Sequence, residues 1–203
     1  MQKYNLKILI SVIAISIGSQ LLAEVYKIDA ATVKKEILPG GYKMGTATNP
    51  EGIEISANNY YLTKGGNPWF PVMGEIHYSR YPRHMWEDAI LKMKAGGITC
   101  VATYSFWIHH EEIEGEFDFS GQRDLRAFIE LCKKHDMPVV LRLGPWCHGE
   151  VKNGGHPDWI YKVCKPGKTR TNDPTYLKYA TRLYEEYYKH SKGLLYKDGG
   201  PII

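Results

Sequence analysis

Apolar residues recur at helical spacing in three segments of the chain, and a short apolar run precedes each segment. In the first segment, Trp86, Ile90 and Met93 occupy positions i, i+4 and i+7, which is the spacing of one helix face. The apolar runs are rich in β-branched and aromatic residues, which is typical of buried strands. They lie at 69–73, 99–107 and 138–143. Strands and helices that alternate in this way predict a parallel sheet covered by helices.

Residues that favour helix ends flank each of the three helical segments. Pro82 begins the first predicted helix, and Gly96 and Gly97 end it. Ser120 is expected to cap the second helix, and Asp173 with Pro174 to start the third. The core face of that third helix is predicted to carry Tyr176, Ala180, Leu183 and Tyr187.

The first 67 residues are organised differently. Residues 1–23 have the features of a secretory signal peptide, because Lys3 and Lys7 precede an apolar run at 8–17 and small residues follow it up to Ala23. An uncleaved anchor or an ordinary buried helix is the alternative. Cleavage would leave a secreted or periplasmic protein with no membrane attachment. Short runs separated by turn residues predict an N-terminal hairpin extension over 24–67, so the alternating strands and helices occupy 68–203.

Composition and charge narrow the possible partners. The chain is 43% hydrophobic and 24% charged, which is an ordinary globular balance. Its net charge of +4 falls to +2 when Lys3 and Lys7 are removed with the leader, and the remaining charges are interleaved, so no nucleic acid partner is expected. The absence of a GxGxxG or Walker loop argues against a nucleotide cofactor, and no cofactor is expected.

Four cysteines are present, and their spacing contains no CxxC pair, so a structural zinc site is not expected. Cys100 and Cys132 fall on apolar faces and are predicted to be free buried thiols. A disulfide between Cys147 and Cys164 is open at this stage.

Polar and aromatic residues gather just after each predicted strand, at Glu75 and His77, at Tyr104 to Glu111, and at 146–153. In a (β/α)8 barrel the active site is built at this carboxyl-terminal rim. Such a barrel needs about 250 residues. Residues 68–203 are therefore expected to supply the first three βα units and, at Pro201 to Ile203, the start of the fourth strand.

Carboxylates flanked by aromatic rings suit carbohydrate chemistry, because sugar C–H faces pack on rings while sugar hydroxyls need acceptors. Glycoside hydrolysis uses two carboxyl groups, and Glu75 and Glu150 are the first pair to consider. Glu150 could instead be a solvated loop acid or a partner of Arg142. His109 and His110 beside Glu111 suggest a metal site, but neighbouring residues of a strand point to opposite faces, so no metal ion is expected.

Longer motifs in the chain resemble the N-terminal part of the catalytic domain of glycoside hydrolase family 35, the β-galactosidase family. The resemblance covers Pro71 to Trp159, with Arg170 to Pro174 and Gly199 to Ile203. The residues that carry it are GEIHYSRYPRHMWEDAILKMKAGGI from Gly74, TYSFWIHHEE from Thr103, GEFDFSGQRDLRAFIELCKKHDMPVVLRLGPW from Gly115, and the final GGPII.

The resemblance implies a retaining, exo-acting enzyme on a (β/α)8 barrel that releases terminal β-D-galactose from oligosaccharides or polysaccharides. It gives Tyr104, Glu150 and the backbone of Gly149 roles in holding sugar hydroxyls. Glu75 and His77, with Arg80, are predicted to form a buried hydrogen-bonded cluster that supports the site, and Glu111 has a supporting role too.

In that family the acid/base Glu ends the fourth strand and the nucleophile Glu comes on the seventh. No residue of this chain receives a catalytic role, so residues 1–203 alone are expected to be inactive. Two alternatives are a truncated galactoside-binding relative without activity, and a barrel glycosidase for another β-linked sugar. Departures from the family pattern leave the aglycone and the sugar specificity open; they are Ile108, Glu112, His148 and Val151.

Overall fold

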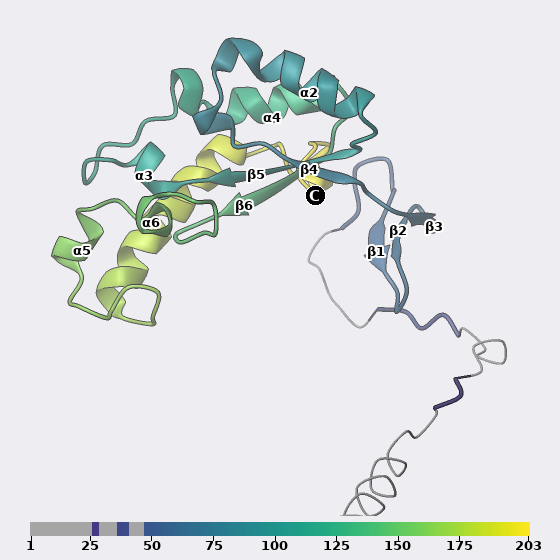
Figure 1. Cartoon of the computed structure of the whole chain (residues 1–203), viewed down its shortest axis with the longest axis horizontal. Coiled ribbons are helices and arrows are strands. Elements are labelled where there is room, and N and C mark those ends of the chain that lie inside the picture. The colour runs from purple at the N-terminus through teal and green to yellow at the C-terminus, as the bar shows by residue number, and fades with distance from the viewer. Residues whose placement is uncertain (1–25, 29–35, 41–46) are drawn as a thin grey trace, which may run out of the picture. The chain divides into compact units, whose positions relative to one another are not determined.

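The computed structural model describes residues 26–28, 36–40 and 47–203 (Figure 1). The predicted signal peptide at 1–23 lies outside the described residues. The chain divides into two units, Met1–Glu36 and Ile37–Ile203, and all the elements below belong to the second. No helix in the described part of the chain is both long and apolar enough to cross a lipid bilayer.

A small antiparallel sheet precedes the main fold. It consists of β1 (Ile55–Ala57), β2 (Leu62–Lys64) and β3 (Asn67–Trp69), in the order β1-β2-β3. Gly65 and Gly66 join β2 to β3 with φ angles of 57° and 79°, which glycine adopts without a steric penalty and which match a tight hairpin turn. The predicted hairpin is thus joined by a third strand, and β3 crosses the expected boundary at residue 67.

The predicted first barrel strand at 69–73 is wrong in position. Trp69 belongs to β3, and the barrel strand β4 begins only at Met73 and ends at Glu75. Between them, Phe70 and Val72 are exposed. Pro71 has no N–H to donate to a neighbouring strand, so it separates the two sheets.

The main sheet is parallel. Its strands β4 (Met73–Glu75), β5 (Cys100–Ser105) and β6 (Val139–Leu143) lie in sequence order, with Met73 beside Cys100 and Val101 beside Val139. Ile202 forms a parallel bridge with Val139, and the Ile203 N–H donates to the Val139 carbonyl oxygen at 3.0 Å. The run at 201–203 therefore takes the next position in the sheet, as the predicted start of a fourth strand requires.

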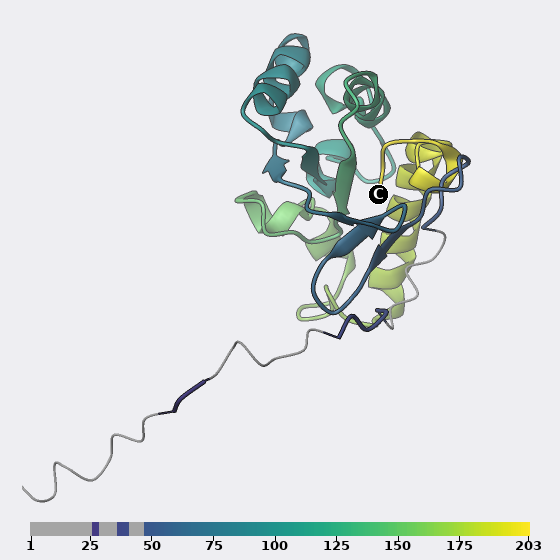
Figure 2. The same cartoon turned by 90° about the vertical axis from the view of Figure 1, so that its right-hand side faces the viewer.

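Three long helices follow the strands: α2 (Trp86–Ala95), α4 (Leu125–Lys134) and α6 (Pro174–Ser191). Helix α4 contacts both α2 and α6, and Figure 2 shows the three helices outside the sheet. The connections contain short helices α3 (Trp107–His110) and α5 (Ile160–Val163), and the single turns η1 (Tyr78–Arg80), η2 (Arg83–Met85), η3 (Gly121–Arg123), η4 (Lys152–Gly155) and η5 (Tyr196–Asp198).

The cap of α4 differs from the prediction. Asp124 caps the helix, and its Oδ1 accepts from the Ala127 N–H at 2.9 Å. The predicted cap, Ser120, instead donates its hydroxyl and its N–H to Oδ1 of Asp118, and the turn η3 separates it from α4. At α6 the prediction is confirmed, because Asp173 Oδ1 accepts from the Thr175 N–H at 3.0 Å.

The core lies between the parallel sheet and the helices. Its fully buried side chains include Trp86, Ile90, Val101, Leu125, Phe128, Ile129, Val139, Leu183 and Tyr187. The predicted core face of the third helix is therefore confirmed. Cys100 and Cys132 are buried free thiols, as predicted, and Cys147 and Cys164 are free as well, so the open question of their disulfide is answered. Burial raises the pKa of Cys132 to about 12, which leaves this thiol unreactive.

Candidate functional site

The parallel register brings the predicted rim residues to one edge of the sheet. Glu75 ends β4 beside Ala102, and Tyr104 on β5 lies beside Arg142 on β6. Arg142 Nη1 donates to Glu75 Oε2 at 2.7 Å, and its guanidinium lies 4.0 Å from the centre of the Tyr104 ring. Arg142 therefore pairs with Glu75, and the alternative reading of Glu150 as its partner is wrong.

His77 connects Glu75 to Arg80. Its Nε2 lies 2.8 Å from Glu75 Oε1, and its Nδ1 bonds Arg80 Nη2. Because a guanidinium can only donate, Nδ1 must accept, so the ring proton is on Nε2 and is donated to Glu75. The predicted hydrogen-bonded cluster thus exists; within residues 1–203 the Glu75 side chain is 40% exposed, and Arg80 is exposed too.

Arg80 holds the loop that follows β6. Its Nη1 donates to the Glu150 carbonyl oxygen at 3.2 Å, its Nη2 donates to the Gly149 carbonyl oxygen, and its guanidinium lies 4.6 Å from the centre of the Phe106 ring. One side chain after β4 therefore positions the two loop residues predicted to hold sugar. The sequence predicted Arg80 in the supporting cluster but not its hydrogen bonds to the loop, because 69 residues separate Arg80 from Gly149.

Gly149 allows the loop to approach β5 closely. A Cβ atom at this position would lie 2.5 Å from Phe106 Cε1 and 3.4 Å from Tyr104 Cδ2. Phe106 is fully buried and cannot move aside easily. The absence of a side chain at Gly149 is what places the loop directly against Tyr104.

Two predicted sugar-holding groups are free to bind a ligand. The Tyr104 ring is buried, and its hydroxyl has no hydrogen-bond partner among the described residues. Glu150 is exposed with a φ of 45°, and its carboxylate likewise has no partner in the part of the chain that the structure describes. A neutral hydroxyl and a carboxylate at one rim can together donate to and accept from sugar hydroxyls.

The rest of this loop is braced by packing around Trp146. The Trp146 ring packs edge-on against His148, and Arg170 lies 4.0 Å from its centre. Gly154 leaves room for the ring, and the Cys147 N–H donates to the Gly154 carbonyl oxygen at 2.8 Å. The Arg170 guanidinium therefore covers one face of the Trp146 ring.

Glu111 is a structural brace behind the rim. Its carboxylate is fully buried and accepts from Trp107 Nε1 at 2.7 Å, from the Gly115 N–H at 2.8 Å, and from Arg182. Trp159 Nε1 donates to its carbonyl oxygen at 2.9 Å. Burial raises the pKa of the Glu111 carboxyl, while the hydrogen bonds oppose that shift. Glu111 thus ties α3, α6 and the loop after β6 together.

His109 and His110 lie in the short helix α3, so the expectation that they lie on a strand is wrong. His110 is fully buried; its Nδ1–H donates to the Asp118 carbonyl oxygen at 2.8 Å, so its Nε2 accepts from the Tyr78 hydroxyl at 2.5 Å. His109 bonds the Ser79 hydroxyl instead. The two rings serve different partners, and within the described ranges no three His, Cys, Asp or Glu side chains form a metal-binding group.

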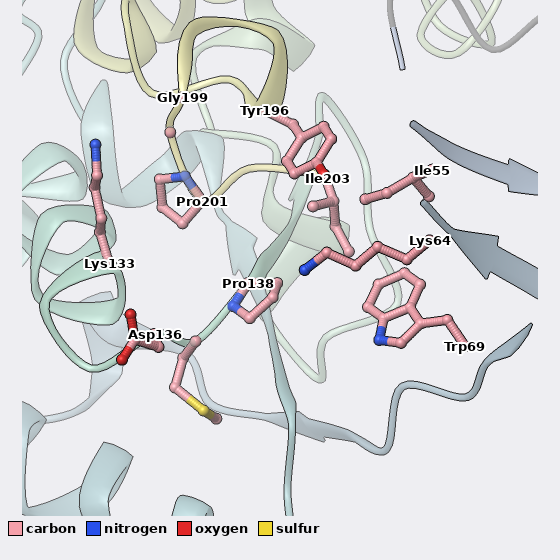
Figure 3. A pocket seen from close by; sticks show the side chains of 12 residues that line it. Ile55, Lys64, Trp69, Lys133, Asp136, Pro138, Tyr196, Gly199, Pro201 and Ile203 are labelled. Carbon is pink, nitrogen blue, oxygen red and sulfur yellow. The ribbon is translucent and has the colours of Figure 1, made fainter. Parts of the chain in front are cut away.

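A cavity of about 260 Å³ lies at the opposite end of the sheet, where β6 begins (Figure 3). Pro138 and Pro201 line it from the starts of two neighbouring strands, and Lys64 and Trp69 line it from the small sheet. Because barrel chemistry is placed at the carboxyl-terminal ends of the strands, we assign no chemistry to this cavity.

The part of the chain that contains β2, β3 and the parallel sheet matches a known protein family. Residues 61–203 match the family model of Glycosyl hydrolases family 35. The exo-β-D-glucosaminidase of Pyrococcus horikoshii is 41% identical over 150 residues, covering 64% of this chain and 19% of that protein. The β-galactosidase of Canis lupus familiaris is 38% identical over 151 residues, covering 74% and 22% respectively. β-Galactosidase 17 of Arabidopsis thaliana is 38% identical over 159 residues, covering 76% and 23%. The chain thus spans about a fifth of the length of these relatives.

Among solved structures, an exo-β-1,4-mannosidase from Opitutaceae bacterium strain TAV5 matches with a TM-score of 0.51 and 15% identity, over 74% of this chain and 25% of that protein. At this identity the likeness concerns the fold alone. It confirms that the three βα units described above are part of a (β/α)8 barrel.

Proposed function

Because this chain belongs to glycoside hydrolase family 35, we propose that the complete protein is a retaining, exo-acting hydrolase that releases terminal β-D-galactose from oligosaccharides or polysaccharides. The observation that carries the proposal is the rim itself, where Arg80 holds the Gly149–Glu150 segment against Tyr104 and leaves the Tyr104 hydroxyl and Glu150 carboxylate free.

Each group has a distinct role in holding the sugar. The Glu150 carboxylate has two oxygens that accept from neighbouring sugar hydroxyls, and such hydrogen bonds to a charged acceptor are about twice as strong as neutral ones. The Tyr104 hydroxyl both donates and accepts. The Gly149 carbonyl oxygen accepts from Arg80, which fixes this backbone segment beside Tyr104.

Bond cleavage is assigned to carboxylates outside residues 1–203. A retaining glycosidase needs a protonated acid and a nucleophile about 5 Å apart. Glu75 fits neither role, because both of its oxygens already accept, one from His77 and one from Arg142. We propose that Glu75 and His77 hold Arg80 and Arg142 in place, and that segments after Ile203 supply the acid/base and the nucleophile.

A second candidate is an exo-β-D-glucosaminidase, which the 41% identity to the Pyrococcus horikoshii protein favours. The same free Glu150 carboxylate could pair with the ammonium group of glucosamine, so the rim described here admits both sugars. A galactoside-binding protein without activity is the remaining alternative.

The test is hydrolysis of nitrophenyl glycosides by the complete protein expressed from its full reading frame. We expect kcat/KM to be highest for the β-D-galactoside, with β-D-glucosaminide and β-D-mannoside as comparisons. Higher kcat/KM for the glucosaminide would select the second candidate. Galactose binding without any turnover would select the non-catalytic alternative.

We also propose that the protein is exported, because residues 1–23 have the composition of a signal peptide. N-terminal sequencing of the protein recovered from the medium or periplasm should begin at Glu24. Recovery of the protein only inside the cell, with residues 1–23 intact, would contradict export.

A further inference from the structure

A shallow polar hollow of about 380 Å³ lies beside the candidate sugar site. Its walls are Ser79, His109, Asp118, Ser120, Gln122 and Arg123. Ser79 is in η1 after β4, and His109 is in α3 after β5, so the hollow is built by the same rim segments as the candidate site. Its volume is within the range of about 300 to 1,000 Å³ that small-molecule pockets occupy.

The hollow adjoins the Arg80 contacts directly. Ser79 precedes Arg80 in η1, and the His109 ring packs edge-on against Phe106 with 5.1 Å between ring centres. Phe106 is the ring that lies under Arg80 and against Gly149. The hollow and the Gly149 loop therefore share Phe106 as a common neighbour.

The charged groups of the wall neutralise each other. Arg123 Nη1 donates to Asp118 Oδ2 at 2.7 Å, and Ser120 donates twice to Asp118 Oδ1. The Ser120 hydrogen bonds, followed by that from Arg123, lower the pKa of Asp118 to about 2, so the pair stays ionised. Burial lowers the pKa of His109, which keeps this ring uncharged at neutral pH. The wall thus presents polar groups without a net charge to attract an ion.

Several hydrogen-bonding atoms of the wall are not used within it. Gln122 Nε2 donates to the Ser79 carbonyl oxygen at 2.8 Å, which leaves its Oε1 as an acceptor. His109 uses Nδ1 on the Ser79 hydroxyl, which leaves Nε2. Arg123 keeps further N–H donors beyond those that face Asp118 and Glu112. Mixed donors and acceptors without net charge suit a neutral ligand that is rich in hydroxyl groups.

We propose that this hollow binds the sugar unit on the aglycone side of the scissile bond, so that the enzyme prefers oligosaccharides to short galactosides. This inference rests on the proposed function. It names His109 and Gln122 as residues that determine the preference for the leaving group. The carboxylate of Glu112, one of the departures from the family pattern, lies 3.9 Å from Arg123 Nη2.

The test compares nitrophenyl β-D-galactoside with a linear β-galactotriose as substrates of the complete protein. His109→Phe keeps the ring contact with Phe106 and removes the ring nitrogens, and Gln122→Leu removes the amide. We expect each variant to raise KM for the triose about three- to tenfold, as the loss of one hydrogen bond predicts, and to change KM much less for the nitrophenyl substrate, because its aglycone has no hydroxyl groups. His84→Phe, an exposed histidine in η2 outside the hollow, is the matched control and should change neither.

Equal KM values for the triose in wild type and both variants, or an equal change on both substrates, would overturn the inference while the proposed function stands. If the complete protein cleaves neither substrate, the proposed function fails, and calorimetric titration with the triose then tests the hollow alone. Binding of the triose that His109→Phe weakens about three- to tenfold supports the hollow, and binding that is absent in wild type or unaltered in the variant refutes it.

Discussion

Replacing Arg80 tests whether one side chain positions the sugar-holding loop. In Arg80→Ala the protein loses the hydrogen bonds to the carbonyl oxygens of Gly149 and Glu150 and the contact with the Phe106 ring. Because the Arg80 side chain is exposed, each hydrogen bond is taken at the ordinary net value of about 1 kcal/mol, and the ring contact at about 0.5 to 1 kcal/mol.

The sum is about 2.5 to 3 kcal/mol, which corresponds to a loss of about 70- to 150-fold in an equilibrium constant. Arg80 does not touch the scissile bond in this account, so the loss should affect substrate binding more than the chemical step. We therefore expect KM for a nitrophenyl β-D-galactoside to rise by about this factor while kcat changes much less. The measurement is steady-state kinetics of the complete protein.

Arg83→Ala is the matched control, since Arg83, like Arg80, donates to a carbonyl oxygen and lies over an aromatic ring; it pairs with a carboxylate in addition. Its partners are Gly121, Asp124 and Trp86, none of them in the loop after β6. Arg83→Ala should leave KM unchanged. A folded Arg80→Ala protein with KM within twofold of wild type, or an equal loss in both variants, would refute the reasoning.

Three further predictions concern the same structure. In Gly149→Ala the new Cβ clashes with Phe106 at a cost of about 1 to 3 kcal/mol, so KM for the nitrophenyl β-D-galactoside should rise. Phe106→Leu in the same chain removes the clash and should restore part of the loss. No recovery in the double variant would contradict the packing argument. Burial lowers the pKa of His110 to about 4, below its ordinary value of 6.5, so its contribution to stability is complete above pH 6.5 and is lost as the pH falls towards 4. Chemical denaturation between these pH values should show a slope near 1.4 kcal/mol per pH unit that flattens in His110→Gln, whereas an unchanged slope would exclude His110 as its source. Burial also raises the pKa of Cys132 to about 12 and that of Cys147 to about 11, so peptide mapping after thiol labelling at pH 8 should find both unmodified in the folded protein and modified after unfolding.

Much of the fold could be predicted from residue patterns that act locally. The apolar periodicity of 82–97 and the Asp173–Pro174 start signal correspond to α2 and α6, and the final apolar run occupies its predicted place beside β6. The resemblance to glycoside hydrolase family 35 is confirmed as well. The position of the first barrel strand was wrong because apolar content alone did not reveal that Pro71 divides it.

The site was harder to predict because its contacts join distant parts of the chain. The strand ends indicated which residues gather at the rim, but the bond from Arg80 to the Gly149 carbonyl oxygen and the contact of Phe106 with Gly149 depend on register and loop path. The placement of His109 and His110 in α3 also escaped the pattern, since aromatic and β-branched residues before them favoured a longer strand.

The central claim is that Glu150 holds a galactose unit at this rim. Calorimetric titration of the complete protein with galactose, in wild type and Glu150→Gln, tests it most directly, with Glu130→Gln on the outer face of α4 as the control. Loss of hydrogen bonds to a charged acceptor should weaken galactose binding at least about tenfold in Glu150→Gln and leave it unchanged in the control. Equal affinity of wild type and Glu150→Gln for galactose would contradict the account.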